Sequence, residues 1–167
     1  MYRACHRHVY AYAVSRVGRD LADDVVGDTF LVAWRRFADL PARDPIPWLL
    51  GVARNVVRER YRTEARQVSL VAELRDWVAE ARADVADDVV ERAAMLAALA
   101  GLAEDDRELL TLVAWHGLSA RAAARVVGCS TATYFVRLHR ARKRLEAALT
   151  NPQTRSTADE RHHAPTG

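Results

Sequence analysis

Apolar residues recur three or four positions apart along most of this chain, and no segment alternates apolar and polar residues as a half-buried strand would. In the first segment Val9, Ala13 and Val17 fall four apart, and Gly18 follows as a helix terminator. A repeat of this length is typical of helices, since side chains four apart share one helix face. The sequence therefore predicts an all-α protein.

A second helix is predicted to start at Asp20, which we place at its N-cap. Its apolar stripe consists of Val26, Phe30, Ala33, Trp34 and Phe37. Acidic residues gather near its start and arginines near its end, where the helix dipole favours them. Three prolines between Leu40 and Pro47 then end the helical pattern and predict a stiff loop.

The next helix is predicted to start at Pro47, a residue type that suits a first helical turn. The residues expected to face inward are Leu49, Val52, Ala53 and Val56. The residues expected on or near the outer side are Arg54, Asn55, Arg58 and Arg62. One face of this helix should therefore build the core, while the other is polar and mostly positive.

The chain changes character in the middle, where residues 67–88 are acidic and only weakly amphipathic. We interpret them as a linker between two small helical domains, residues 1–66 and 89–150. The polar tail, residues 151–167, is expected to be disordered. Within the second domain, helices are predicted to end at Gly101 and Gly117.

A helix-turn-helix is predicted in the stretch "ARVVGCSTATYFVRLHRARKRL", residues 124–145. Ser119 and Ser130 are predicted N-caps of its two helices, and Gly128 supplies the positive φ that the turn requires. The buried side of the second helix is expected to contain Tyr134, Leu138, Ala141, Leu145 and Leu149. Its free side is expected to present Thr131, Phe135, Val136, His139, Arg140 and Lys143.

The net charge of the chain is only +3, yet positive charge is concentrated in this motif. Between Ser119 and Leu145 there is no acidic residue, while the basic ones are Arg121, Arg125, Arg137, Arg140, Arg142, Lys143 and Arg144. Neutralising the phosphates of DNA is a physical reason to gather charge in this way. The alternative is an Arg-rich soluble surface that reflects a GC-rich genome, and the turn signature disfavours it.

Other functional classes find little support in the sequence. Cys5 and Cys129 lack the spacing of a disulfide framework or zinc site, which favours a reducing, cytoplasmic setting without metal. The N-terminal segment lacks the apolar core of a signal peptide, so none is expected, and no apolar run is long enough to cross a membrane. No phosphate loop, metal-spaced pair or nucleophile motif is visible. We therefore predict no enzymatic activity and no cofactor.

Three blocks of the chain resemble the extracytoplasmic-function (ECF) sigma factors, the compact two-domain initiation factors of bacterial transcription. They are "DDVVGDTFLVAWRRF", "PWLLGVARNVVRERYR" and "GLSARAAARVVGCSTATYFVRLHRARKRL". The resemblance implies a sigma region 2-like bundle, which binds core RNA polymerase and opens the minus-ten element. It also implies a sigma region 4-like helix-turn-helix domain, which binds the minus-thirty-five element. Promoter DNA and core RNA polymerase are then the partners, with an anti-sigma protein as a further one.

The resemblance also implies functional residues at matching positions. Those for core polymerase binding are Asp24, Asp28, Phe30, Ala33, Trp34 and Arg35. Those for the minus-ten element are Arg43, Asp44, Trp48, Asn55, Arg58 and Arg62. For the minus-thirty-five element, the residues expected to contact the DNA phosphates are Arg121, Arg125, Arg137, Arg142 and Lys143. The residues expected to contact the base edges of the same element are Thr133, Phe135, Val136, His139 and Arg140.

Two questions stay open at the level of sequence. Trp48 either stacks on a melted base or packs in the core, and its place at the start of a core helix favours packing. The chain as a whole has an alternative interpretation as a stand-alone helix-turn-helix regulator that binds a symmetric operator as a dimer. The block "DVVGDTFLVAWRR" beside a proline loop and basic helix favours the sigma factor instead. A protein that merely sequesters a partner would not need the basic segment.

Overall fold

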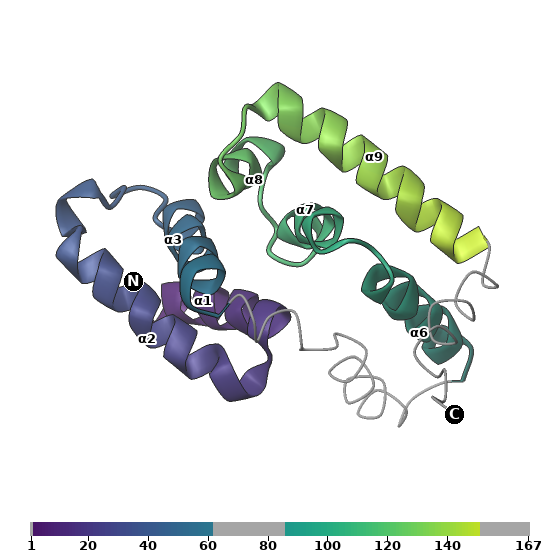
Figure 1. Cartoon of the computed structure of the whole chain (residues 1–167), viewed down its shortest axis with the longest axis horizontal. Coiled ribbons are helices and arrows are strands. Elements are labelled where there is room, and N and C mark those ends of the chain that lie inside the picture. The colour runs from purple at the N-terminus through teal and green to yellow at the C-terminus, as the bar shows by residue number, and fades with distance from the viewer. Residues whose placement is uncertain (1, 62–85, 151–167) are drawn as a thin grey trace, which may run out of the picture.

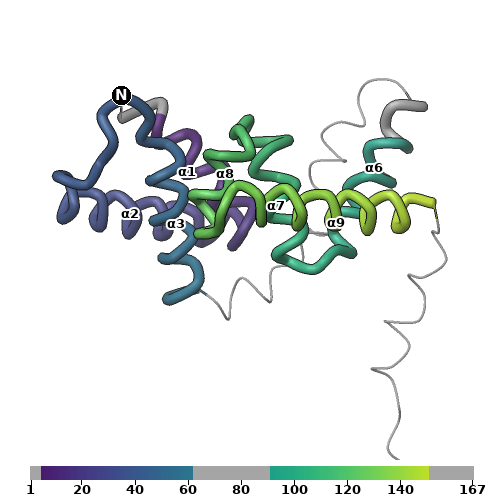
Figure 2. The backbone as a smooth tube through the Cα atoms, turned by 90° about the horizontal axis from the view of Figure 1, so that it is seen from above, coloured from purple at the N-terminus to yellow at the C-terminus, as the bar shows by residue number. Residues whose placement is uncertain are grey.

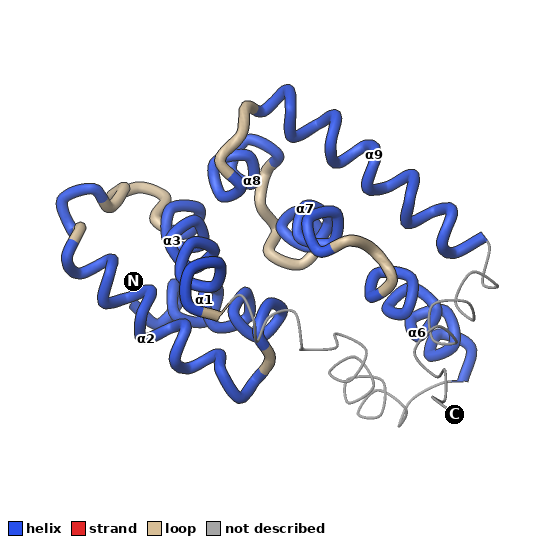
Figure 3. The backbone as a smooth tube through the Cα atoms, in the orientation of Figure 1, coloured by secondary structure: helices blue, strands red, loops and turns tan. Residues whose placement is uncertain are grey.

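The computed structural model of this chain describes residues 2–61 and 86–150. Within these two ranges every regular element is a helix, and no strand is present (Figure 3). This confirms the predicted all-α fold. Arg62, the polar tail and residues 67–85 of the predicted linker lie outside the described residues.

The first helical group consists of α1 (Tyr2–Val17), α2 (Arg19–Arg35) and α3 (Ile46–Arg60), with a short 3₁₀ turn at Phe37–Asp39. Each of the three helices packs against the other two (Figure 1). The predicted inward residues of α1 and α3 are buried: Val9, Ala13, Val17, Leu49, Val52, Ala53 and Val56. Burial of these apolar side chains is the main favourable term for the group.

The second helical group consists of α6 (Ala86–Ala100), α7 (Glu104–Ala114), α8 (Ala120–Val127) and α9 (Thr131–Thr150). The long helix α9 packs on the other three, with α6 near its C-terminal end (Figure 2). Because α6 starts at Ala86, the last three residues of the predicted linker, 86–88, are helical. Helix α7 ends at Ala114, before the predicted Gly117, which lies in the connection to α8 with φ 64°.

The chain enters its helices mostly where the sequence indicates. The side chain of Ser119 accepts a hydrogen bond from the Ala122 amide at 3.2 Å, which confirms the predicted cap of α8. The cap of α9 is also confirmed, since Ser130 Oγ lies 3.1 Å from the Thr133 amide. The N-cap predicted at Asp20 is wrong. Gly18, with φ 84°, makes the turn from α1, and α2 therefore begins at Arg19.

The apolar stripe predicted for α2 is only partly correct. The buried residues of this helix are Ala22, Val25, Val26, Thr29 and Ala33. Trp34 is 79% exposed and Phe37 is 66% exposed, so neither belongs to the core. Small residues fill the core face because α1 and α3 pack closely against it, and the bulky aromatic side chains are left on the outer surface.

The two helical groups are in contact, with α8 beside α3 (Figures 1 and 2). At this contact Gly51 of α3 faces the backbone of Val126, whose carbonyl oxygen would lie 3.9 Å from a Cβ atom at Gly51. The absence of a larger side chain lets α8 approach. A single cluster of buried apolar residues extends through both groups as a result.

A buried polar network also joins the two groups. Tyr12 of α1 donates a hydrogen bond to Glu108 Oε1 at 2.6 Å. Arg54 Nε donates to both carboxylate oxygens of Glu108, at 3.1 and 3.0 Å. Arg54 is only 7% exposed, so its predicted place on the outer side of α3 is wrong. The carboxylate of Glu108 compensates the burial of its charge.

The contact between the groups also buries part of a titratable side chain, that of His116. His116, which follows α7, is half-buried against the ring of Tyr12, with ring centroids 5.8 Å apart. Its Nε2 atom is buried and has no hydrogen-bond partner in the described part of the chain. Burial, reinforced by the charge of His8, lowers the pKa of His116 to about 4.

Acidification should therefore destabilise the folded chain through His116. Its unfolded pKa is about 6.5, so between about pH 6.5 and 4 the unfolded state takes up a proton that the native state does not. At pH 5 this costs about 2 kcal/mol of unfolding free energy relative to pH 7.5. Urea denaturation at both pH values should show a smaller loss for His116→Gln than for wild type. Equal losses in the two proteins would contradict this assignment.

Candidate nucleic-acid interface

The helix-turn-helix is fixed by a small number of local contacts. Gly128 ends α8 in the left-handed region with φ 75°, as predicted, and the Ser130 cap starts α9 two residues later. Tyr134 is fully buried, and its hydroxyl donates to the Leu109 carbonyl at 2.7 Å. Burial raises the pKa of Tyr134, which keeps this donor protonated. The orientation of α9 is therefore anchored on α7.

The two faces of α9 separate largely as predicted. Tyr134, Leu138 and Ala141 are buried, whereas Leu145 is half-buried and Leu149 is 38% exposed, so the buried face ends before Leu149. The exposed candidates for DNA contact on α9 are Thr133, Phe135, Val136, His139, Arg140, Arg142 and Lys143. Arg121 and Arg125 are exposed on α8. The structure thus leaves these side chains accessible, and their individual roles stay predictions.

Acidic residues of α7 lie beside this basic segment, which the sequence did not indicate. Arg144 Nη1 donates to both carboxylate oxygens of Asp106, at 3.0 and 2.9 Å. Arg137, a half-buried phosphate candidate, lies 3.8 Å from Asp105. Both carboxylates belong to the first turn of α7, where the helix dipole favours negative charge. The net positive charge around the helix-turn-helix is therefore lower than the number of its basic residues suggests.

The candidate residues of the first helical group gather around α3 and the loop before it. Asn55 and Arg58 are exposed on α3, and Arg43 and Asp44 are exposed in the loop. Trp48 is partly buried, and the guanidinium group of Arg36 lies over its ring, 5.8 Å from the centroid. Trp48 therefore packs against the core and also borders the surface.

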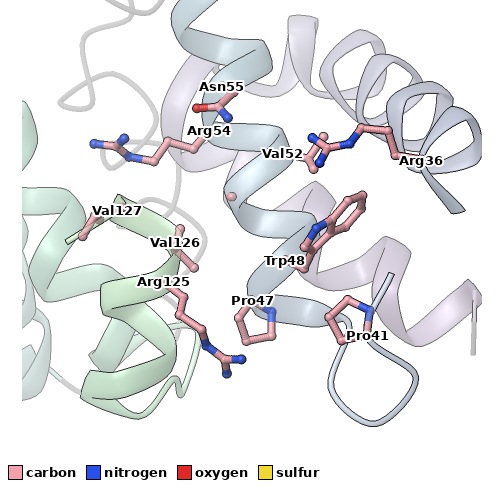
Figure 4. Close-up of a pocket in the computed structure, with 12 residues that line it drawn as sticks. Arg36, Pro41, Pro47, Trp48, Val52, Arg54, Asn55, Arg125, Val126 and Val127 are labelled. Carbon is pink, nitrogen blue, oxygen red and sulfur yellow. The ribbon is translucent and has the colours of Figure 1, made fainter. Parts of the chain in front are cut away.

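A cavity of about 410 Å³ lies between α3 and α8 (Figure 4). Trp48, Asn55 and Arg54 line it from α3, and Arg125 lines it from α8. Figure 4 shows Arg36 beside the indole of Trp48 and Val126 turned toward α3. An aromatic ring, an amide and guanidinium groups are the chemistry that suits a nucleobase and its phosphate.

The polymerase-binding candidates on α2 do not all share one surface. Asp24 and Arg35 are exposed, and Phe30 is half-buried. Asp28 accepts a hydrogen bond from Tyr61 at 3.1 Å and pairs with Arg60 at 2.7 Å. These two contacts tether the C-terminal end of α3 to α2.

Ala33 is only 6% exposed and offers almost no surface to a partner. Trp34 is the prominent group on this helix, accompanied by Leu31, which is 44% exposed, and by Phe37. The spacing of three between Leu31 and Trp34 is the sequence signal that would have predicted a second apolar stripe on this helix.

Comparison with known proteins agrees with this architecture. Residues 1–67 match the family Sigma-70 region 2, and residues 92–145 match Sigma-70, region 4. The ECF RNA polymerase sigma factor EcfG of Rhodopseudomonas palustris is 34% identical over 146 residues, which cover 83% of this chain and 77% of the relative.

Two solved structures have a similar fold. The complex of the sigma factor RpoE with the anti-sigma factor NepR from Bartonella quintana contains a chain that is 24% identical, with a TM-score of 0.62. This match covers 89% of the present chain and 93% of the other. CnrH, solved in complex with the cytosolic domain of CnrY, is 27% identical with a TM-score of 0.57. The match covers 89% of this chain and 83% of the CnrH chain.

Two helical groups, with a helix-turn-helix in the second and both sigma-70 regions in this order, are the architecture of a transcription initiation factor. The chain belongs to the ECF RNA polymerase sigma factors. It binds core RNA polymerase and directs promoter recognition and the initiation of transcription, with promoter DNA as its second partner. The stand-alone regulator of a symmetric operator is not favoured.

Two further findings concern the part of the chain that the structure describes. None of its helices combines the length and apolar character that a membrane span requires. Nor do three or more His, Cys, Asp or Glu side chains gather there in a way that could hold a metal ion.

Proposed function

We propose that the three surfaces described above divide the work of initiation. The exposed apolar surface of α2 around Trp34 docks on the polymerase. Helix α3 and its loop hold the melted minus-ten strand, and α9 enters the major groove of the minus-thirty-five element. The observation that carries this proposal is the exposed face of α9 with Phe135, Val136, His139 and Arg140, held outward by the anchored turn.

The minus-ten assignment rests on the chemistry around α3. A base taken out of the duplex loses its stacking, which a pocket with an aromatic wall and cationic groups can offset. Asn55 and Trp48 both line the cavity. We expect the Asn55 amide to form hydrogen bonds with a base edge. Arg43 and Arg58, both exposed, would contact the strand's phosphates. Arg62, the remaining member of the predicted minus-ten set, lies outside the described residues.

The minus-thirty-five assignment rests on the mixture of groups along α9. Apolar Phe135 and Val136 are suited to thymine methyl groups, and Arg140 is suited to the acceptor edge of guanine. Basic side chains on both helices of the motif flank them and would position the duplex. Residues 1–66 and 89–150 would act as the two DNA-binding domains, joined by residues 67–88.

We further propose that the chain catalyses no reaction itself, because the polymerase forms the phosphodiester bonds. It would act in the cytoplasm, where the thiols of Cys5 and Cys129 stay reduced. An anti-sigma protein would be a further partner. This proposal is supported by CnrH, which was solved with the cytosolic domain of CnrY.

Reconstituted transcription tests these assignments. The full chain, purified core RNA polymerase and a library of randomised promoters are mixed, and the transcripts are sequenced. We expect start sites that share one minus-thirty-five and one minus-ten sequence. Arg140→Ala should relax the preference at one minus-thirty-five position by about 1–3 kcal/mol. Asn55→Ala should relax the sequence preference in the minus-ten element and leave that in the minus-thirty-five element unchanged.

The matched control is Glu59→Ala, which changes another exposed residue on the same helix as Asn55. We expect it to leave both sequence preferences unchanged. Transcripts with no shared upstream sequence, or tight binding of an inverted repeat by a homodimer without polymerase, would contradict the proposed division.

A further inference from the structure

Glu108 is a buried acid whose side chain is held by the other helical group. It is 3% exposed on α7 of the second group, yet both its carboxylate oxygens bind side chains of the first. Tyr12 donates to Oε1, and Arg54 donates to both oxygens. A buried carboxylate is stable only with such partners, so this network favours contact between the two groups.

The network is shielded from water on every member. Tyr12 is 1% and Arg54 is 7% exposed. Burial and the charge of Glu108 raise the pKa of Tyr12 well above its ordinary value, so the tyrosine remains a donor. A second pair, Arg16 with Glu104 at 2.6 Å, joins α1 to α7 nearby, but its carboxylate side chain is 47% exposed. Glu108 is therefore the central polar link between the groups.

We call the arrangement in which the two helical groups are in contact closed. It brings together candidate surfaces for two promoter elements that lie far apart on DNA. Arg125, a candidate for the minus-thirty-five phosphates, lies 3.8 Å from Asp44 of the minus-ten loop. The two promoter elements are about 25 base pairs apart, which is about 85 Å of duplex. One chain cannot contact both elements while these two residues are neighbours. The helical groups have to separate when the promoter is bound.

Arg54 changes its surroundings when they separate. In the closed arrangement it lines the same cavity as Trp48 and Asn55, but Glu108 neutralises it. Without Glu108 it becomes an additional cation on the helix proposed to hold the melted strand. A carboxylate and a phosphate offer similar paired oxygens to a guanidinium group, so either can occupy Arg54.

We propose that Glu108 is an internal latch that occupies Arg54 in the free protein, keeps the two helical groups closed, and is replaced on Arg54 by a phosphate of the minus-ten strand. The part concerning the strand rests on the proposed role of α3. Closure masks a DNA contact in the free factor, and opening adds that contact to the strand-binding surface.

The test compares Glu108→Gln with wild type in the full chain. Glutamine keeps the shape of the side chain but removes its charge, so the link to Arg54 is weakened. Small-angle X-ray scattering should show a larger radius of gyration for the variant. Fluorescence anisotropy with a single-stranded minus-ten oligonucleotide should show about tenfold tighter binding, the gain of one charge-assisted contact. Glu91→Gln, the same change at an exposed site on α6, should alter neither quantity.

Two further variants separate the parts of the proposal. Gly51→Leu places a side chain against Val126 and should open the chain without touching any charge. The double variant Glu108→Gln, Arg54→Gln should be open but should lose the gain in oligonucleotide binding. Circular dichroism confirms that each variant is folded before it is compared.

The outcomes are distinct. An unchanged radius of gyration in folded Glu108→Gln overturns the latch, even if the wild-type chain initiates transcription with polymerase. An expanded chain whose oligonucleotide affinity is unchanged overturns the role of Arg54 in binding the strand. If Asn55→Ala also leaves minus-ten preference unchanged in reconstituted transcription, the fault lies in the proposed role of α3.

Discussion

Replacing Trp34 with alanine is expected to weaken the binding of core RNA polymerase by at least about 30-fold. The indole is 79% exposed at the C-terminal end of α2, and Leu31 and Phe37, each three residues from it in the sequence, are also exposed. Exposed aromatic groups of this kind mark protein interfaces, where a central tryptophan contributes about 2–4 kcal/mol. Because the side chain hardly contacts the core, its removal should leave the fold intact.

The measurement is a titration of labelled protein with purified core polymerase. Trp115→Ala is the matched control, since Trp115 is also a large exposed aromatic residue, 48% accessible, in the second helical group. We expect the control to retain most of the affinity and both variants to retain the wild-type thermal transition. Wild-type affinity in Trp34→Ala would show that this surface does not dock on the polymerase.

Leu138→Ala is expected to lower the unfolding free energy of the second helical group by about 2–5 kcal/mol. Leu138 is 3% exposed on the face of α9 that packs on α7 and α8. The loss combines the apolar area that is no longer buried with the cavity that remains. Since α9 is held in place by this face, binding of minus-thirty-five duplex should be lost together with stability.

Val136 provides the contrasting variant on the same helix. It is 51% exposed, so Val136→Ala should change the unfolding free energy by less than about 0.5 kcal/mol. Its proposed contact is with the bases, and duplex preference should change while stability does not. Urea denaturation followed by circular dichroism, together with duplex binding, distinguishes the two effects. Equal stability of the two variants would contradict the assigned faces of α9.

Features set by neighbours in the sequence could be predicted. The caps at Ser119 and Ser130 and the left-handed Gly128 depend on hydrogen bonds and backbone angles within a few residues. The buried faces of α1 and α3 follow from helical spacing in the same way. The prediction at Asp20 was wrong because a glycine earlier in the chain makes the turn at which α2 begins.

Features set by distant partners could not be predicted. Arg54 falls on a polar face by spacing, and only the position of Glu108, 54 residues later, explains its burial. Asp28 matched the polymerase-binding segment of the family, yet in the structure its carboxylate pairs with Arg60 and accepts a hydrogen bond from Tyr61. Helical periodicity identifies which residues share a face, but it does not identify the element that packs against that face.

The acidic first turn of α7 also affects how the factor responds to ionic strength. Arg137 and Arg144 already have carboxylate neighbours, so on binding DNA they would exchange one anionic partner for another. Such an exchange releases fewer condensed cations from the duplex than seven unpaired basic side chains would. Promoter occupancy should consequently fall less steeply as potassium chloride is added than the number of arginines suggests.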